Sequence, residues 1–225
     1  MNKIITTNSN QEFVKTICET IKEEANKNIE KKGEFTFVLS GGRTPKVIFE
    51  ELATNYKTAI EWNKVHFFWL DERCVEPTHE DSNYKLAFDH LISKLDDVGS
   101  IHRIKGELAP TVAANIYRDD IFNFFGYSPP KFDFILLGMG EDGHIASIFP
   151  LSREFKEKNN IVMSTNKKYN GYYRITLGLN IINKSFNKLL MINSTKKYKI
   201  YKKKDIDMPI SFIKQNTKVV VVYVK

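Results

Sequence analysis

Short apolar runs that end in polar clusters are the feature of this sequence that most constrains its fold. Three runs lead directly into such clusters: Phe35–Leu39 into Ser40–Pro45, Val65–Leu70 into Asp71–Arg73, and Phe132–Leu137 into Gly138–His144. Each run has the length of a buried strand, and segments with helical periodicity separate the runs. Strands that alternate with helices predict an α/β fold in which helices cover both faces of a mostly parallel sheet.

The helical segments carry local start and stop signals. Ser9 and Glu12 form a capping-box pattern, apolar residues then recur at helical spacing, and Gly33 ends the run. Pro45 suits the first turn of a second helix. Further helices are expected over Tyr84–Leu95, over Ala109–Phe125 and in a Lys/Tyr-rich segment near residue 200. Further strands are expected at Ile101–Ile104, Tyr172–Leu177, Lys188–Ile192 and Lys218–Val224, and an exposed loop is expected over residues 156–170.

Length and composition favour a single globular domain over residues 1–225. The chain has 42% hydrophobic residues and neither a low-complexity linker nor an internal repeat. No apolar run reaches the ~18 to 20 residues that a membrane span needs, and no secretory leader is visible, so no membrane partner is expected. Cys18 and Cys74 form no CxxC pair. We therefore expect no disulfide framework and a reducing, cytoplasmic location.

The net charge of +7 has two interpretations. A basic patch binds nucleic acid or an acidic substrate, whereas scattered lysines on solvated faces have no specific partner. The lysines are scattered apart from Lys196–Lys197 and Lys202–Lys204, and no nucleic-acid motif accompanies them. We therefore expect no nucleic-acid partner.

The three polar clusters predict one site, because ligands bind beyond the carboxyl ends of the strands in open parallel sheets. Gly41 and Gly42 lead into a helix start, where backbone N–H groups and the helix dipole favour an anion, and Arg43 adds a planar donor set. The cluster Asp71–Arg73 is either a surface ion pair or part of the site. A short loop later, Asp81 is expected to cap the next helix.

The third cluster offers a candidate acid–base group. Its Gly-x-Gly-x-x-Gly spacing matches a dinucleotide fingerprint, but Pro150 interrupts the expected helix and no acidic residue follows at the required distance. Among its glycines lie Asp142 and His144, an imidazole with a carboxylate that can orient it. The other four histidines are interpreted as structural. No nucleophile elbow and no metal-ligand spacing occur, so neither a metal nor an organic cofactor is expected.

At these residues the sequence resembles the 6-phosphogluconolactonase family over nearly the whole chain. The resemblance is carried by Ser40–Pro45, Asp71–Val75 with Asp81–Asn83, Gly138–Pro150, Arg174–Leu177, Lys196 and Pro209–Ser211. It implies the Rossmann-like α/β fold of the sugar-phosphate isomerase and deaminase type. It also implies hydrolysis of a phosphorylated sugar lactone, 6-phospho-D-glucono-1,5-lactone.

The chain departs from the family pattern at two notable positions. Ile145 stands where threonine is usual, and Asn193 replaces the glycine that precedes Lys196. The related deaminases carry Asn-Glu-Pro where this chain has Ser147–Pro150. The carboxylate that a deaminase uses beside its histidine is therefore absent, which disfavours that alternative.

The resemblance and the residue chemistry together suggest roles for the candidates. His144 is the expected general base and Asp142 orients it, while Arg73 stabilises the oxyanion or holds the substrate, and Asp71 fixes Arg73 or binds sugar hydroxyls. The substrate phosphate is expected on Gly41, Gly42, Arg43 and Thr44, with Arg174 and Lys196 completing the clamp.

Several alternatives stay open at this point. Which arginine touches phosphate is undecided, and a non-catalytic sugar-phosphate sensor or a nucleotide-binding protein would share parts of the pattern. The chain is either a separate protein or one that is fused to or associated with glucose-6-phosphate dehydrogenase.

Overall fold

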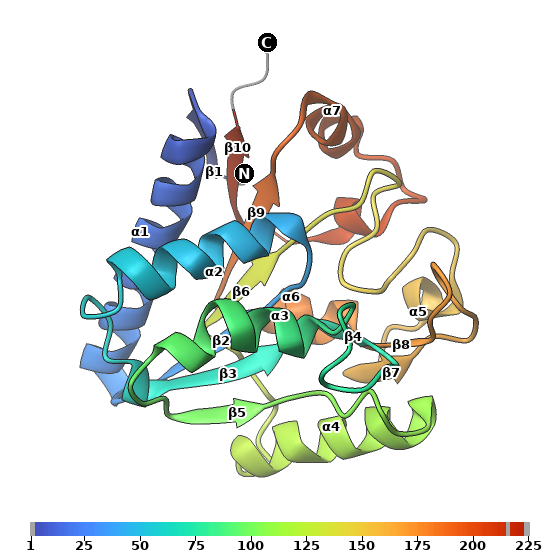
Figure 1. Cartoon of the computed structure of the whole chain (residues 1–225). Helices are drawn as coiled ribbons and strands as arrows, with labels where there is room; N and C mark the ends of the chain where they lie inside the picture. The colour runs from blue at the N-terminus through green and yellow to red at the C-terminus, as the bar shows by residue number, and fades with distance from the viewer. Residues whose placement is uncertain (1–2, 215–216, 223–225) are drawn as a thin grey trace.

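The computed structural model describes residues 3–214 and 217–222. The apolar runs form parallel strands of a seven-stranded sheet with the order β1-β10-β9-β6-β2-β3-β5 (Figure 1). The strands are β1 Lys3–Thr7, β2 Phe35–Leu39, β3 Val65–Trp69, β5 Ser100–His102, β6 Phe134–Leu137, β9 Asn187–Ile192 and β10 Thr217–Val222. This confirms the predicted α/β fold with a mostly parallel sheet. The last two residues of the predicted strand Lys218–Val224 lie outside the described residues.

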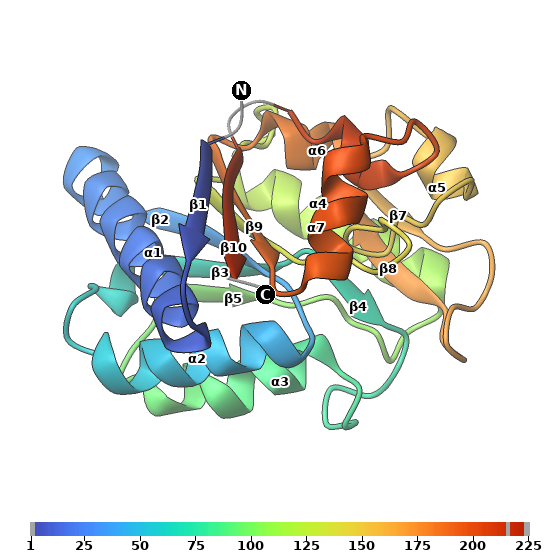
Figure 2. The same ribbon diagram turned by 90° about the horizontal axis from the view of Figure 1, so that it is seen from above.

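Helices cover both faces of the parallel sheet (Figure 2). Helices α1, α2 and α3 pack in one layer, and α4 and α6 lie on the opposite side. The helices are α1 Asn10–Lys32, α2 Arg43–Asn55, α3 Asn83–His90, α4 Pro110–Phe124, α5 Arg153–Lys156, α6 Leu179–Lys184 and α7 Thr195–Lys203. Short 3-10 helices occupy Trp62–Lys64, Ile92–Lys94 and Pro209–Phe212. Within the described residues, no helix has the length and apolarity that a bilayer crossing needs.

Helix α1 begins and ends where its local signals predict. The Ser9 hydroxyl accepts the backbone N–H of Glu12 at 3.1 Å, and the Glu12 carboxylate accepts the N–H of Asn8 at 2.6 Å. These bonds satisfy donors that have no partner inside the helix. At the other end Gly33 adopts φ +85°, a left-handed conformation that glycine reaches without Cβ strain, and its N–H bonds to Ile29.

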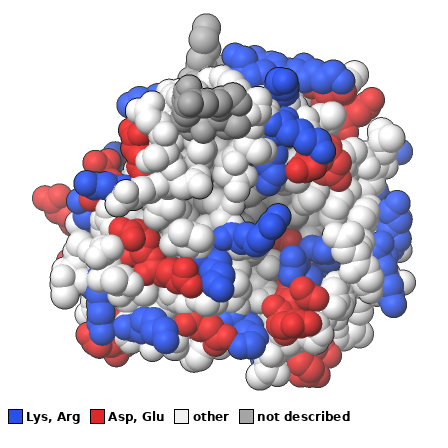
Figure 3. All heavy atoms as spheres, turned by 45° about the horizontal axis from the view of Figure 1, so that its top comes forward, with Lys and Arg blue, Asp and Glu red and all other residues white. Residues whose placement is uncertain are grey.

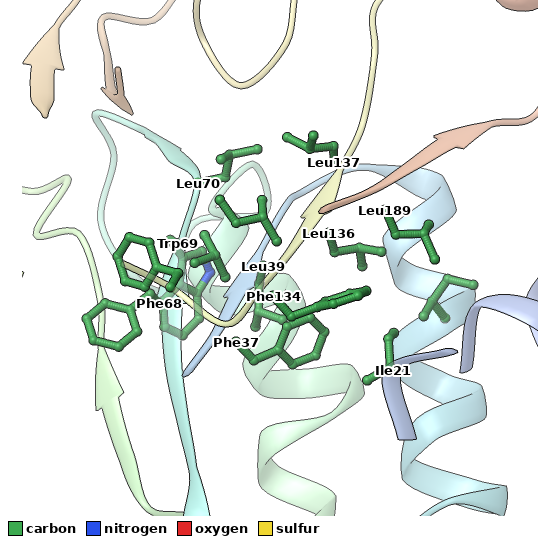
Figure 4. Packing of buried hydrophobic residues seen from close by; sticks show 14 of the residues in the cluster. Ile21, Phe37, Leu39, Phe68, Trp69, Leu70, Phe134, Leu136, Leu137 and Leu189 are labelled. Atoms are coloured by element: carbon green, nitrogen blue, oxygen red, sulfur yellow. The ribbon is translucent and has the colours of Figure 1, made fainter. Parts of the chain in front are cut away.

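The core lies between the parallel sheet and its two helical layers. Strands β2 and β6 are buried at every residue, which agrees with a sheet that is covered on both faces. Phe37 lies opposite Phe67 and Phe134 in the strand register, and its ring centroid is 5.9 Å from that of Phe134 in an edge-to-face pair (Figure 4). Burying each such ring contributes roughly 1.5–3 kcal/mol, so these strands hold the rim above them in a fixed position.

A second, three-stranded antiparallel sheet was not predicted. Its order is β4-β8-β7, with β4 at Asp71–Arg73, β8 at Arg174–Leu177 and β7 at Val162–Ser164. The expected strand Tyr172–Leu177 thus belongs to this small sheet. The expected exposed loop over residues 156–170 is wrong in part, because β7 lies within it and its Val162 and Met163 are buried.

Two further features of the structure differ from what local sequence predicts. Strand β1 was not predicted, and its strand conformation depends on parallel pairing with the distant β10. Asp81 does not cap α3. Ser82 does so instead by accepting the N–H of Lys85 at 3.1 Å. Both differences arise because contacts between remote segments override weak local preferences.

The segment after β6 does not have the structure of a dinucleotide-binding motif. No helix follows Gly138–Gly143, and the next helix is the single turn of α5. A dinucleotide fingerprint requires a helix that starts directly after the strand, so that its N-terminus can hold the pyrophosphate. The Gly-x-Gly-x-x-Gly spacing in this chain therefore does not indicate a dinucleotide-binding site.

Candidate active site

A cavity of about 580 Å³ opens at the carboxyl ends of β2, β3, β6 and β9. Figure 3 shows a hollow on this face with lysine and arginine side chains around it. Its lining includes Ser40–Pro45, Leu70, Asp71, Arg73, Asn83, Gly138–Glu141, His144, Ala146, Arg174, Met191, Asn193, Ser194 and Lys197. All three polar clusters expected at strand ends therefore meet at one cavity, as the parallel arrangement predicts.

The first cluster forms a tight turn between β2 and α2. Gly42 adopts φ +105° and precedes the first residue of the helix, Arg43. A Cβ on Gly41 would lie 1.7 Å from Oδ1 of Asn83, so only glycine allows the turn to approach α3 so closely. Because α2 starts at the cavity, its N-terminal N–H groups and Arg43 provide a positive region there.

The third cluster places the imidazole of His144 in the cavity wall. Its Nδ1 lies 2.6 Å from Oδ1 of Asp142, and the same oxygen accepts the backbone N–H of His144 at 3.1 Å. Burial alone would raise the pKa of Asp142, but the hydrogen bonds and charge of His144 outweigh it and lower that pKa. A carboxylate at Nδ1 favours the tautomer with the proton on Nδ1, which leaves Nε2 free to accept a proton.

Gly140 allows the histidine to occupy this position. A Cβ on Gly140 would lie 2.2 Å from Cε1 and Nδ1 of His144 and 2.6 Å from Oδ1 of Asp142. The ring of Phe149 has its centroid 4.5 Å from that of His144. The imidazole therefore packs closely against both a glycine backbone and an aromatic ring.

Arg73 and Arg174 lie directly opposite each other in the β4–β8 pair. Both arginines line the cavity, and Arg174 is only 7% exposed. Burial lowers the pKa of Arg174, the charge of Asp71 opposes this, and the charge of Arg73 adds to it. Like charges directly opposite on two strands destabilise a sheet, so a bound anion would stabilise this pair.

Asp71 connects the clusters and does not fix Arg73. Its Oδ2 accepts the hydroxyl of Ser147 at 2.6 Å, and its Oδ1 accepts the side-chain amide of Asn83 at 3.3 Å. The NH1 of Arg73 instead donates to the backbone carbonyl of Asp81 and lies 3.9 Å from the Asp81 carboxylate. Of the two roles expected for Asp71, fixing Arg73 is therefore wrong, and binding sugar hydroxyls stays a prediction. Its position in the lining still suits contact with a ligand.

Lys197 lines the cavity, whereas the expected Lys196 does not. The ammonium of Lys196 pairs with Glu141 at 2.5 Å and is well exposed. Burial lowers the pKa of Lys197, Glu141 opposes this shift, and Arg43 adds to it. Helix α7 begins after its cap Ser194 and presents Lys197, the next residue along, to the cavity.

The two departures from the family pattern have structural partners. Asn193 donates its side-chain amide to the hydroxyl of Thr44 at 2.8 Å, which connects the end of β9 to the start of α2. Ile145 is fully buried and forms isolated bridges with Met139 and Ile148. Both residues therefore support the cavity wall.

Glu72 is a supporting residue that the sequence analysis did not single out. Its carboxylate accepts the backbone N–H groups of Arg73, Asn83 and Tyr84 and the hydroxyl of Ser82 at 2.7–2.9 Å. Burial raises the pKa of Glu72 to about 7, although these hydrogen bonds favour its charged form. The signal in the sequence was a carboxylate directly after a buried strand, where charge is costly unless it is hydrogen-bonded.

The described part of the chain contains no cluster of three His, Cys, Asp or Glu side chains suited to holding a metal ion. Arg43, Arg73, Arg174 and Lys197 supply positive charge to the cavity, and the His144–Asp142 pair supplies a basic nitrogen. This combination can bind an anionic ligand and remove a proton from a water molecule beside it.

Comparison with known proteins agrees with this geometry. The family described as glucosamine-6-phosphate isomerases/6-phosphogluconolactonase matches residues 8–222. A probable 6-phosphogluconolactonase 4 of Arabidopsis thaliana is 42% identical over 68% of this chain, which spans only 64% of that relative. A 6-phosphogluconolactonase of Nostoc is 34% identical over 75% of this chain and 70% of its own length.

A solved structure extends the similarity to the whole fold. The crystal structure of 6-phosphogluconolactonase from Thermotoga maritima superposes with a TM-score of 0.87 and 30% sequence identity. The superposition covers 99% of each chain, so it includes both the parallel sheet and the small sheet that carries Arg73 and Arg174. With its family match, its relatives and its fold in agreement, the chain belongs to the 6-phosphogluconolactonase family, within the wider family of glucosamine-6-phosphate isomerases and 6-phosphogluconolactonases.

Proposed function

We propose that this protein hydrolyses 6-phospho-D-glucono-1,5-lactone to 6-phosphogluconate. The observation that carries the proposal is that His144, which is paired with Asp142, lines a cavity that arginines also line. Ester hydrolysis needs an activated water, a stabilised oxyanion and a held substrate, and this cavity has a residue type for each. The family relationship supports the same reaction.

In the proposed mechanism His144 is the general base. Its Nε2 takes a proton from water as the water oxygen attacks the lactone carbonyl carbon, and Asp142 stabilises the imidazolium that forms. The carbonyl oxygen gains negative charge in the tetrahedral intermediate. The ring C–O bond then breaks, and the leaving oxygen receives the proton from His144. The products are a carboxylic acid and a free hydroxyl, so the atoms of one water molecule are accounted for.

The positive groups divide between the two ends of the substrate. Arg73 lies on β4 beside Asp71 and is assigned to the developing oxyanion or the carboxylate of the product. The N-terminus of α2 with Arg43 and Thr44 is assigned to the phosphate, and Arg174 and Lys197 complete the positive lining. Lys197 replaces Lys196 in this proposal because only Lys197 lines the cavity.

Deaminase chemistry is less well supported. The segment after Ala146 is Ser147–Pro150, so no carboxylate follows His144 where a deaminase carries its glutamate. The hydroxyl of Ser147 is bonded to Asp71, and the ring of Phe149 packs beside His144. A non-catalytic sensor would keep the positive lining and would not need His144.

The deciding experiment measures lactone hydrolysis above the spontaneous background, with wild type and His144→Gln side by side. Loss of a general base typically lowers the rate ~10² to 10⁴-fold. A wild-type rate equal to the background would exclude the lactonase and leave the sensor. A His144→Gln rate close to wild type would exclude the assigned base.

Two aspects of the cellular setting stay proposals. The cysteines Cys18 and Cys74 are free, which suits a reducing compartment such as the cytoplasm. Association with glucose-6-phosphate dehydrogenase would be detected by co-elution of the two proteins, and separate elution would argue against it.

A further inference from the structure

The segment between β7 and β8 forms a hairpin whose tip is Tyr169–Tyr172. At its base the N–H of Thr165 donates to the carbonyl of Arg174 at 2.8 Å. At its tip Tyr169 and Tyr172 exchange backbone hydrogen bonds of 2.8 and 3.3 Å. Asn170 and Gly171 have φ of +50° and +85°, and Asn-Gly is the pair that favours a two-residue hairpin turn with positive φ. The local sequence of the tip therefore favours the turn that it forms.

Through Phe149, the hairpin contacts His144, the proposed general base. The ring of Tyr169 stacks on that of Phe149 with centroids 3.6 Å apart and an interplanar angle of 7°. Phe149 in turn lies against His144, with 4.5 Å between the ring centroids. A single line of rings thus runs from the hairpin to the imidazole.

The side chain of His144 is not enclosed by the core, since 31% of it is exposed. A second open hollow of about 540 Å³ shares His144 and Glu141 with the main cavity. Its other lining residues include Phe149, Tyr169 and Asn170. His144 therefore lines both hollows, and the stacked rings of Phe149 and Tyr169 line the second one beside it.

The second and third contacts reach the arginine pair. The backbone carbonyl of Tyr169 accepts NH2 of Arg174 at 3.3 Å. The hydroxyl of Tyr172 donates to Oδ2 of Asp81 at 2.8 Å, and the carbonyl of Asp81 accepts NH1 of Arg73. One short hairpin is thus connected to three groups of the proposed site, namely His144, Arg174 and Arg73.

We propose that the hairpin Thr165–Tyr172 positions the catalytic groups, with Tyr169 as the positioning residue for His144 and Tyr172 as the positioning residue for Arg73. This inference rests on the proposed function. Neither tyrosine needs to touch the substrate. A purely structural hairpin would affect stability and leave the state of the imidazole and the rate unchanged.

The test compares substitutions that remove one contact each. Tyr169→Leu removes the ring stack and keeps the backbone carbonyl, Tyr169→Phe keeps the stack, and Tyr172→Phe removes only the hydroxyl. Tyr173→Leu is the matched control, because this tyrosine directly follows the hairpin, is 38% exposed and lines neither hollow.

Two readouts separate positioning from packing. Steady-state kinetics on the phosphorylated lactone gives kcat and KM, and NMR titration of the His144 ring nitrogens gives its tautomer and pKa. A displacement of about 1 Å costs up to roughly 10²-fold in rate, so Tyr169→Leu should lower kcat by about 10- to 100-fold with little change in KM. It should also shift the His144 signals, while Tyr169→Phe and Tyr173→Leu should match wild type. Tyr172→Phe should lower kcat or raise KM without moving the His144 signals.

The inference is overturned if folded Tyr169→Leu keeps the wild-type kcat, or if its His144 signals coincide with those of Tyr173→Leu. It is also overturned for Arg73 if Tyr172→Phe has wild-type kinetics. If wild type itself does not hydrolyse the lactone, the proposed function fails. The NMR comparison still decides in that case whether Tyr169 positions His144.

Discussion

Replacing Gly140 by alanine should displace the proposed base without unfolding the protein. The added Cβ would lie 2.2 Å from Cε1 and Nδ1 of His144 and 2.6 Å from Oδ1 of Asp142. Non-bonded carbon atoms normally rest about 3.5–4.0 Å apart, so the imidazole must move by more than about 1 Å or break its bond to Asp142. Gly140 is not among the glycines with positive φ, so alanine can adopt its backbone conformation.

The expected result is a fall in kcat of about 100-fold, the cost of misplacing a catalytic group by roughly 1 Å. The assay is lactone hydrolysis corrected for the spontaneous rate, together with thermal unfolding. Gly138→Ala is the matched control, since it adds the same methyl group in the same loop with no atom within 4 Å of the new Cβ. Its unfolding midpoint should match that of Gly140→Ala, and its kcat should fall far less, because no ring has to move.

The reasoning is refuted if Gly140→Ala turns over near the wild-type rate while it remains folded. The position of His144 against Asp142 would then not limit the reaction. Equal losses of kcat in Gly138→Ala and Gly140→Ala would also refute it, because they would show that the loop tolerates no added methyl group, whether or not it contacts His144.

Three further predictions concern the phosphate, the helix behind the cavity and the effect of acid. Arg43→Ala should weaken use of the phosphorylated lactone by about 10- to 100-fold, since a charge-assisted hydrogen bond contributes ~1.5–3 kcal/mol, and should barely change use of the unphosphorylated lactone. Equal losses in the kinetics of both lactones would place Arg43 elsewhere. Glu72→Gln should lower the free energy of unfolding in urea by about 1–3 kcal/mol, because the amide cannot accept all four hydrogen bonds that the carboxylate accepts. Burial lowers the pKa of His66 although Glu34 opposes this shift. The folded state therefore binds a proton at His66 less readily than the unfolded state, so the contribution of His66 to stability is full above pH ~6.5 and declines as the pH falls below it. Urea unfolding between pH 8 and 5 should show a shallower decline for His66→Asn, and identical slopes would contradict the assignment.

Much of the fold and of the candidate site followed from local sequence. Periodicity distinguishes strands from helices because their side chains repeat every two or 3.6 residues. The capping pair Ser9 and Glu12 and the left-handed Gly33 act within a few residues, so the bounds of α1 were predictable. The carboxyl ends of parallel strands share one edge of the sheet, which is why three separate clusters were expected at one cavity and were found there.

Tertiary structure alone decided the contacts that cross the chain. Arg73 faces Arg174, and Ser147 reaches Asp71 across 76 residues of sequence, because β4 and β8 pair in a small sheet, and local sequence does not specify that pairing. The choice of Lys197 over Lys196, and of Ser82 over Asp81 as a cap, likewise depends on how each helix packs against its neighbours. Local sequence determines the conformation that a segment prefers, whereas the partner of a side chain depends on the register between remote segments, which only the packed structure specifies.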